Sequence, residues 1–164
     1  MKFNGRKVIR KSGYNYSFSG CYFITICSKE KKFIFGDIKE RKMYLNEVGK
    51  LTKLEILRLN NEKDVDVVKF VIMPNHVHLL IFLKSDANCF IERKGKKLED
   101  VRVLAEARIP KIIQQFKSRV SRCVGTSIWH SRYHDHIVRN QREYKMIYNY
   151  IENNPMNWDK DCYR

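Results

Sequence analysis

The sequence lacks paired cysteines and long apolar runs. Its five cysteines are an odd number and form no CxxC pair, which argues against a disulfide framework and against a zinc ribbon. No apolar run approaches the roughly 18 residues of a membrane span, and no apolar segment follows the basic start of the chain, as it would in a signal peptide. These absences predict reduced thiols, a cytoplasmic protein and no membrane partner.

The chain also lacks internal repeats, low-complexity segments and a GxxxxGK[ST] loop. Its 164 residues suit one domain with its own hydrophobic core. We therefore predict a single domain over residues 1–164. Within it, residues 1–19 are expected to form a basic arm and residues 84–108 a variable loop region.

Acidic residues are scarce beside basic ones. Lysine and arginine number 33 against 18 aspartate and glutamate residues, which gives a formal net charge of +15. The excess lies in Met1–Lys53 and Ile109–Arg164. An enzyme that acts on neutral metabolites does not need this charge, whereas binding a polyanion exploits it through counterion release. We expect a nucleic-acid partner, although a basic and merely solvated surface would give the same composition.

The hydrophobic pattern predicts strands and helices in an α+β order. A helix is expected near residues 46–60, with Val48, Leu51, Leu54 and Leu57 among its apolar positions. The other expected elements are strands over 21–27, 65–72 and 76–83, a hairpin over FIFGDI and RKMYL, a helix over 109–124, a loop plus strand over 128–139, and a helix capped by Asn140 that ends near Asn153. This order favours a largely antiparallel sheet covered by helices.

Two histidines stand in the apolar segment VIMPNHVHLLI, which spans Val71–Ile81. Side chains alternate between the two faces of a strand, so His76 and His78 share one face while the intervening positions form a wholly apolar core face. Two imidazoles placed in this way can bind one metal ion. The alternative is a pair of exposed or hydrogen-bonded histidines beside a turn.

The last predicted helix, REYKMIYNYIENN, contains three tyrosines. Tyr144 and Tyr148 fall on one stripe with two isoleucines, which predicts that both tyrosines lie in the core. Tyr150 lies off this stripe, and Asn154 follows one turn later on nearly the same side. A metal ion held by two histidines could polarise a phosphodiester for a tyrosine nucleophile, and Asn154 could add an oxygen ligand. A surface position for Tyr150 is the plainer alternative.

With these motifs in place, the chain resembles the single-tyrosine HUH transposases of bacterial insertion sequences, and within them the REP-associated tyrosine transposase group. HUH stands for His-hydrophobe-His. The resemblance covers roughly residues 6–158, and the segment between Lys84 and Arg108 has no counterpart in it. It rests on GYNYSFSGCYFITIC, FVIMPNHVHLLI, IIQQFKSRV, IWHSRYHDHIVRN and YNYIENNP.

The resemblance implies a ferredoxin-like α+β sandwich with an antiparallel sheet. It implies that His76 and His78 bind Mg²⁺ or Mn²⁺ and that Tyr150 is the catalytic nucleophile. Asn154 would complete the metal site at a position where many members of the group carry glutamine. Imidazole ligands suit Mn²⁺ better than Mg²⁺.

The implied activity is that of a metal-dependent DNA strand transferase acting on single-stranded DNA beside a hairpin. Tyr150 would form a covalent 5′-phosphotyrosine, and a second DNA 3′-hydroxyl would then rejoin the strands. No ATP is needed, because the covalent link conserves the bond energy. Such a protein would be cytoplasmic in a bacterium and associated with the nucleoid when bound to DNA. Whether it acts as a monomer or a homodimer stays open.

Basic residues in two segments are candidates for contacts with the DNA backbone, and nearby aromatic residues could stack on bases. One segment is the N-terminal arm and the other is the helix over 109–124. The candidates are Arg6, Lys7, Arg10, Lys11, Lys117, Arg119 and Arg122.

Three other functions compete with this interpretation. A zinc hydrolase could use His76 and His78 with His134 and His136, but four neutral ligands without HExxH would be unusual. More in keeping with the motif, Asp135 and His136 would support the site without binding the metal. A non-catalytic DNA-hairpin-binding protein derived from such a transposase is the second alternative, and an RNA-recognition domain is the third.

Overall fold

The computed structural model describes residues 20–84 and 108–164. The predicted basic arm, and all but the two ends of the predicted variable region, lie outside these residues. Both predictions therefore stay predictions, as does the extent of the single domain.

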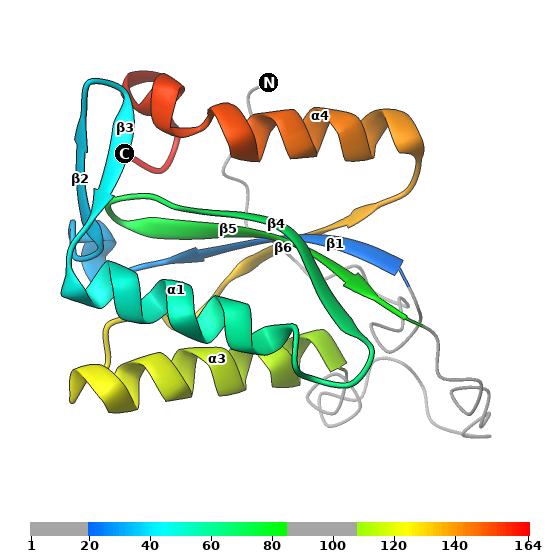
Figure 1. The fold of residues 1–164 in the computed structure, drawn as a ribbon, viewed down its shortest axis with the longest axis horizontal. Helices are drawn as coiled ribbons and strands as arrows, with labels where there is room; N and C mark the ends of the chain where they lie inside the picture. Colours follow the sequence, from blue (N-terminus) through cyan, green and yellow to red (C-terminus); the bar gives the residue numbers. More distant parts are fainter. Residues whose placement is uncertain (1–19, 85–107) are drawn as a thin grey trace.

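A four-stranded antiparallel sheet forms the centre of the fold (Figure 1). Its strands, in spatial order, are β4 (Val65–Ile72), β5 (His76–Leu83), β1 (Gly20–Cys27) and β6 (His134–Val138). Along the chain the order is strand, helix, two strands, helix, strand. With this pairing, the α+β ferredoxin-like sandwich predicted from the sequence is confirmed. The predicted strand over 21–27 begins one residue earlier, and those over 65–72 and 76–83 match the predicted bounds.

Three helices cover the two faces of the sheet, as Figure 1 shows. α1 (Glu47–Leu59) and α3 (Arg108–Val124) lie side by side on one face. α4 (Gln141–Asn153) crosses the other face and is followed by the 3-10 segment η3 (Pro155–Lys160). None of the helices described is long and apolar enough to cross a membrane.

The ends of the helices follow from local sequence. The side chains of Asn46 and Asn140 each accept a hydrogen bond from the backbone N–H three residues later, which caps α1 and α4 as N-cap asparagines do. α3 ends at Val124, and the next residue, Gly125, has a φ of 81° in the left-handed region that glycine adopts without strain. The cap predicted at Asn140 is thus present.

A small hairpin of β2 (Gly36–Lys39) and β3 (Lys42–Leu45) lies beside the main sheet. Its two-residue turn, Glu40–Arg41, has positive φ at both positions (49° and 61°), as a type I′ turn requires. Position 36 requires glycine, because a Cβ there would lie 2.0 Å from the Tyr44 carbonyl oxygen. A short 3-10 turn, η1 (Lys29–Lys31), precedes the hairpin.

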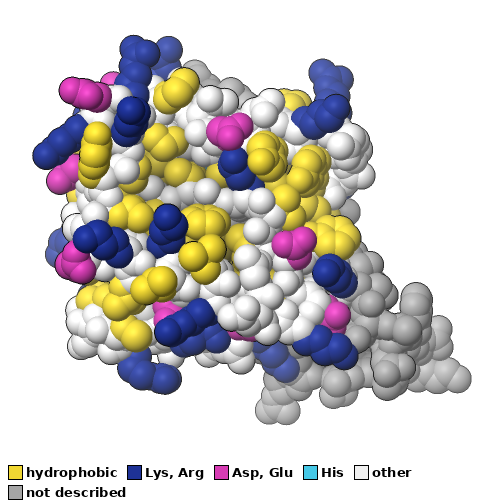
Figure 2. Space-filling view, in the orientation of Figure 1, with side chains coloured by type: hydrophobic (Ala, Val, Ile, Leu, Met, Phe, Trp, Pro, Cys, Tyr) yellow, Lys and Arg dark blue, Asp and Glu magenta, His cyan; other side chains and the backbone are white. Residues whose placement is uncertain are grey.

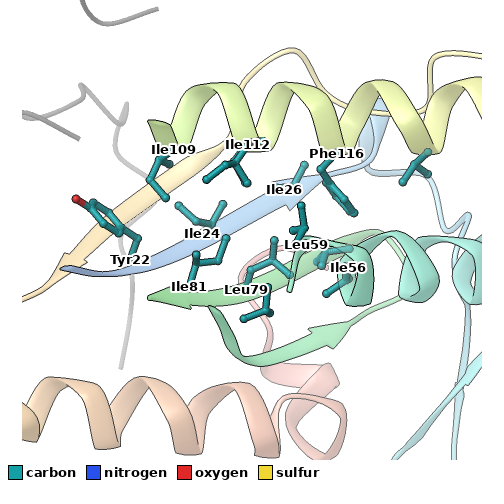
Figure 3. Close-up of a cluster of buried hydrophobic side chains, with 14 of the residues drawn as sticks. Tyr22, Ile24, Ile26, Ile56, Leu59, Leu79, Ile81, Ile109, Ile112 and Phe116 are labelled. Carbon is teal, nitrogen blue, oxygen red and sulfur yellow. The ribbon is translucent and has the colours of Figure 1, made fainter. Parts of the chain in front are cut away.

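The main hydrophobic core fills the space between the sheet and the α1–α3 pair (Figure 3). Alternate residues of β1 and β5 point into it, among them Ile24 and Leu79, and Phe116 of α3 packs against them. All three side chains are fully buried. Removing this apolar area from water supplies most of the stability of such a domain.

The buried face of α1 differs from the simple apolar stripe. Leu54 and Leu57 are 57% and 45% exposed, whereas Gly49, Thr52 and Glu55 are buried. Gly49 is buried because a Cβ there would lie 2.1 Å from a backbone oxygen of the segment before β2. Glu55 is buried because it pairs with arginines of α1 and α3. The hydrophobic pattern of the sequence identifies neither the close backbone approach at Gly49 nor the buried ion pair at Glu55.

Candidate metal and nucleophile site

The second face of β5 is as closed to solvent as the core face. His76 and His78 are both 0% exposed, because residues of α4 and of the C-terminal segment 155–164 pack against them. Among the side chains on the face that Figure 2 presents, no histidine is visible. The two histidines are therefore not exposed. The other form of that alternative, two hydrogen-bonded histidines beside a turn, is present.

The two imidazoles converge through their Nε2 atoms. His76 Nε2 lies 3.1 Å from His78 Nε2, and the ring centroids are 4.5 Å apart. The opposite nitrogen of each ring is anchored to the protein. His76 Nδ1 lies 2.7 Å from Asn75 Oδ1, and His78 Nδ1 lies 2.8 Å from Thr25 Oγ1.

One of these contacts fixes the ring proton of His76. Asn75 donates its Nδ2 to the backbone oxygen of Tyr163 at 2.8 Å, so its Oδ1 accepts from His76 Nδ1–H. The Nε2 of neutral His76 then carries a lone pair and faces His78 Nε2. On the other side of the pair, the Thr25 hydroxyl lies within hydrogen-bond distance of His78 Nδ1. Partners of this kind orient histidine ligands in metal sites.

α4 brings Tyr150 and Asn154 to this pair. The Tyr150 hydroxyl lies 3.3 Å from His78 Nε2, and its ring meets Phe23 edge-on at 6.0 Å. Asn154 is 3% exposed, and its side chain interacts with both the Tyr150 hydroxyl and the Asp161 carboxylate. Within residues 20–84 and 108–164, its Oδ1 accepts no hydrogen bond. The structure thus joins four residues that the sequence separated by up to 78 positions.

The other two tyrosines of α4 are half-buried, so the core position predicted for them is only partly confirmed. Tyr144 and Tyr148 lie on a small hydrophobic cluster around Ile147 and Ile151. Tyr148 also accepts a hydrogen bond from Lys69 of β4 at 3.4 Å. Their placement leaves Tyr150 as the tyrosine of this helix whose hydroxyl reaches His78.

The C-terminal segment supplies residues that the sequence interpretation missed. Asp161 Oδ2 lies 3.7 Å from His76 Nε2, and the Asp161 side chain is 2% exposed. The Tyr163 ring lies 5.0 Å from the His76 ring and 5.6 Å from the His78 ring, and Trp158 lies 6.2 Å from His76. The available signal was two aromatic residues and two acidic residues after Pro155, more than an exposed tail needs.

The burial of the site holds its histidines neutral. Burial lowers the pKa of His76 to about 3, and burial together with the neighbouring His76 lowers the pKa of His78 well below its ordinary value. The His76–Asp161 contact is therefore not an ion pair at neutral pH. Burial also raises the pKa of the Tyr150 hydroxyl, which stays protonated unless a positive charge lies beside it.

The donor set fits a divalent cation. Nitrogens of His76 and His78 and a carboxylate oxygen of Asp161 all lie within 4.8 Å of one another. The Asp161 Oδ2 and Asn154 Oδ1 atoms are buried without a hydrogen-bond partner among the described residues. Leaving such atoms unpaired costs free energy, which a cation would recover. Imidazole and carboxylate together suit Mn²⁺ and related first-row ions.

The predicted DNA-contact residues do not gather at this site. Lys117, Arg119 and Arg122 lie on α3, on the opposite side of the sheet from α4. Lys117 donates to two backbone oxygens at 2.7 and 3.2 Å, and Arg119 pairs with two glutamates, while Arg122 is exposed. Arg6, Lys7, Arg10 and Lys11 lie outside the described residues.

The second histidine cluster also separates from the metal-ligand atoms. His136 Nε2 bonds Glu143 Oε1 of α4 at 2.6 Å, and the His134 ring lies 5.9 Å from Tyr163. Neither belongs to the group of close ligand atoms in the described chain, so the four-histidine zinc site is not formed. Asp135 pairs with Ile24, which places it on the α1–α3 face and away from His76 and His78.

Comparisons with known proteins agree on one family. The family model described as IS200-like transposase matches residues 16–154. An uncharacterized protein of Haemophilus influenzae is 34% identical over 95% of this chain and 91% of its own length. A second protein of that organism, named as a candidate REP-associated tyrosine transposase, is 27% identical over 88% of this chain and 76% of its own length.

A comparison with solved structures concerns the fold. A solved structure of a REP-associated tyrosine transposase bound to a REP hairpin superposes with a TM-score of 0.60. That match has 18% sequence identity and covers 88% of this chain and 72% of the other. At this identity the match concerns the fold alone.

Proposed function

The chain belongs to the IS200-like transposase family, and from this premise we propose that it cleaves and rejoins single-stranded DNA beside hairpins through a covalent 5′-phosphotyrosine. One observation carries the proposal. The Tyr150 hydroxyl, on α4, lies 3.3 Å from a nitrogen of a buried histidine pair on β5. Nucleophile and candidate metal ligands from distant parts of the chain thus meet in one place.

His76 and His78 are the proposed metal ligands, and Asn154 is proposed to add its partnerless Oδ1. When bound, Mg²⁺ or Mn²⁺ polarises the scissile phosphate and offsets its negative charge. To hold the metal, both imidazoles would present an Nε2 lone pair. His78 would then carry its ring proton on Nδ1, which lies 2.8 Å from Thr25 Oγ1.

Tyr150 performs the first chemical step. Its hydroxyl oxygen attacks the scissile phosphorus, the tyrosine–phosphate bond forms, and the bond to the 3′-oxygen breaks. The tyrosine loses its proton, and the departing 3′-oxygen gains one and becomes a free 3′-hydroxyl. Burial raises the pKa of Tyr150 and opposes this loss, and the interaction with Asn154 offsets part of that rise.

A second DNA 3′-hydroxyl reverses the step. Its oxygen attacks the phosphotyrosine, the new phosphodiester forms, and Tyr150 regains its proton. One phosphoester bond is exchanged for another at each step, so no nucleoside triphosphate is consumed. This agrees with the lack of a GxxxxGK[ST] loop in the sequence.

A DNA hairpin as substrate is supported by the REP-hairpin complex of the structural relative and by the net charge of +15. We propose that the basic N-terminal arm takes part in holding the DNA backbone. Arg122 of α3 is the other exposed candidate, whereas Lys117 and Arg119 are engaged within the protein. This activity would be exerted in the cytoplasm, on the nucleoid.

A non-catalytic DNA-hairpin-binding protein is the alternative. It is favoured by one observation, the depth at which the site is closed. His76 and His78 are fully buried, and the C-terminal segment lies over them. A DNA strand would have to displace part of this cover to bring a phosphate within reach of Tyr150.

The test is a search for a covalent adduct. The protein is incubated with a labelled single-stranded DNA library rich in hairpins and with Mn²⁺, and a denaturing gel is inspected for labelled protein. We expect an adduct that Tyr150→Phe abolishes, because the phenyl ring keeps the packing against Phe23 and lacks the nucleophilic oxygen.

Tyr148→Phe is the matched control on the same helix, and it should leave the adduct intact. Tyr163→Phe is the second comparison, since that ring also adjoins both histidines. An adduct lost only in Tyr163→Phe would move the nucleophile to Tyr163. Tight, salt-dependent binding of hairpins without any adduct would favour the binding protein.

A further inference from the structure

The C-terminal segment reaches the histidine pair with one acidic side chain. η3 turns the chain back after α4, so that Asp161 lies beside His76. Tyr163 and Trp158 pack around the same imidazole. In addition, Asn75, the residue that orients His76, donates to the Tyr163 backbone oxygen at 2.8 Å. The segment is therefore tied to the site at several points.

The Asp161 carboxylate interacts with the Asn154 side chain, and its two oxygens differ in their hydrogen bonds. One oxygen, Oδ1, accepts a hydrogen bond from the Tyr163 backbone N–H at 2.7 Å. The other, Oδ2, is buried, has no hydrogen-bond partner among the described residues and faces His76 Nε2 at 3.7 Å. A carboxylate oxygen without a partner in a buried site is costly unless a cation completes it.

The Asp161 carboxylate would add a negative charge, which the other candidate ligands lack. Two imidazoles and an amide oxygen are all neutral, whereas Mg²⁺ and Mn²⁺ favour anionic oxygen ligands. Two histidines with one carboxylate also leave coordination positions open, which a substrate phosphate can take.

We propose that Asp161 is the carboxylate ligand of the metal site, so that the C-terminal segment 155–164 completes the site. The proposal rests on the metal-dependent function proposed above and extends it to a residue that lies beyond the family match at residues 16–154. On this view the segment is part of the site rather than only a cover over it.

The test measures metal binding without DNA. Mn²⁺ is titrated into the full-length protein, and free Mn²⁺ is followed by its electron paramagnetic resonance signal. Asp161→Asn keeps the shape of the side chain and removes its charge. We expect it to weaken Mn²⁺ binding at least ~10-fold, as the loss of groups at metal sites commonly does.

Asp159→Asn is the matched control. Asp159 lies two residues earlier and loses the same charge, but its side chain is 87% exposed and pairs with Arg164. Its Mn²⁺ affinity should stay within about twofold of the original, since an exposed charge is screened by solvent.

Melting curves separate a ligand from a structural residue. In EDTA, Asp161→Asn should melt at the same temperature as the original protein or higher, because an unpaired buried charge is removed. The rise in melting temperature on adding Mn²⁺ should be lost in this variant and kept in Asp159→Asn. Should Asp161→Asn fail to fold, Asp161→Glu, which keeps the carboxylate, is expected to bind Mn²⁺ within tenfold of the original.

Two outcomes would overturn the proposal. One is Mn²⁺ binding by Asp161→Asn that equals or exceeds that of the original protein, which would make the segment a cover that competes with the metal. The other is no Mn²⁺ binding by the original protein at millimolar concentration. The DNA adduct is scored separately, so an Asp161-dependent metal site without an adduct would leave this inference standing and refute the strand transferase alone.

Discussion

Leu79 and His78 are neighbours on one strand, both fully buried, and their side chains enter opposite faces of the sheet. The Leu79 face is packed with aliphatic and aromatic side chains under α1 and α3. The His78 face holds imidazoles kept neutral by burial and two polar oxygens without hydrogen-bond partners among the described residues. One face contributes stability through apolar burial, whereas the other gives up stability by burying polar atoms that are candidate metal ligands.

The largest expected effect on the free energy of unfolding comes from a substitution on the Leu79 face. Leu79→Ala should lower the free energy of unfolding by about 3 kcal/mol, because it leaves a cavity among fully buried neighbours. Urea unfolding in EDTA measures this. The folded fraction of the variant should still gain stability from Mn²⁺, since the ligands lie on the other face.

Leu54→Ala is the control for that variant. Leu54 is 57% exposed, so its truncation should change the free energy of unfolding by less than about 0.5 kcal/mol. A loss of the Mn²⁺ response in Leu79→Ala, in protein that remains folded, would show that the two faces are not independent.

The next effect comes from protonating the His78 face. The pKa of His76 is lowered from 6.5 to about 3 in the folded protein, so the unfolded chain takes up the proton first as the pH falls. The stability that depends on neutral His76 is therefore complete above about pH 6.5 and is lost as the pH falls toward about 3. We expect a loss on the order of 2 kcal/mol between pH 6 and pH 4.

Urea unfolding in EDTA at several pH values tests this loss. His76→Asn should flatten the decline by roughly 1 kcal/mol per pH unit, because it removes one group that titrates. His130→Asn should keep the decline, since His130 is exposed. Parallel pH curves for all three proteins would contradict the picture of an acid-sensitive face.

Much of the fold was predictable because its elements are locally determined. β5 shows a two-residue alternation, α3 an apolar stripe that ends at Gly125, and α4 an asparagine cap. These are signals of period and of chain ends, which neighbouring residues carry. The buried Gly49 and Glu55 of α1 were not predictable, because their burial depends on the Phe35 backbone and on the arginines that pair with Glu55.

The candidate site likewise contains residues that the sequence predicts and one that it does not. His76, His78, Tyr150 and Asn154 could be named from alternation, helical spacing and resemblance, and the fold brings them together. Asp161 could not, because its approach to His76 depends on a turn after α4 that has no periodic pattern. A single acid after a helix has no partner in the sequence until the fold supplies one.

The smallest expected effect compares the helices that cover the two faces. Asn46 caps α1 and Asn140 caps α4, each by accepting one backbone N–H at 2.9 Å. Replacing either by alanine should cost about 1 kcal/mol of unfolding free energy. The costs should match, but only Asn140→Ala loosens the helix that holds Tyr150, so only it should slow adduct formation, by several-fold. Equal adduct rates in the two variants would mean that the first turn of α4 is not coupled to Tyr150, ten residues further along the helix.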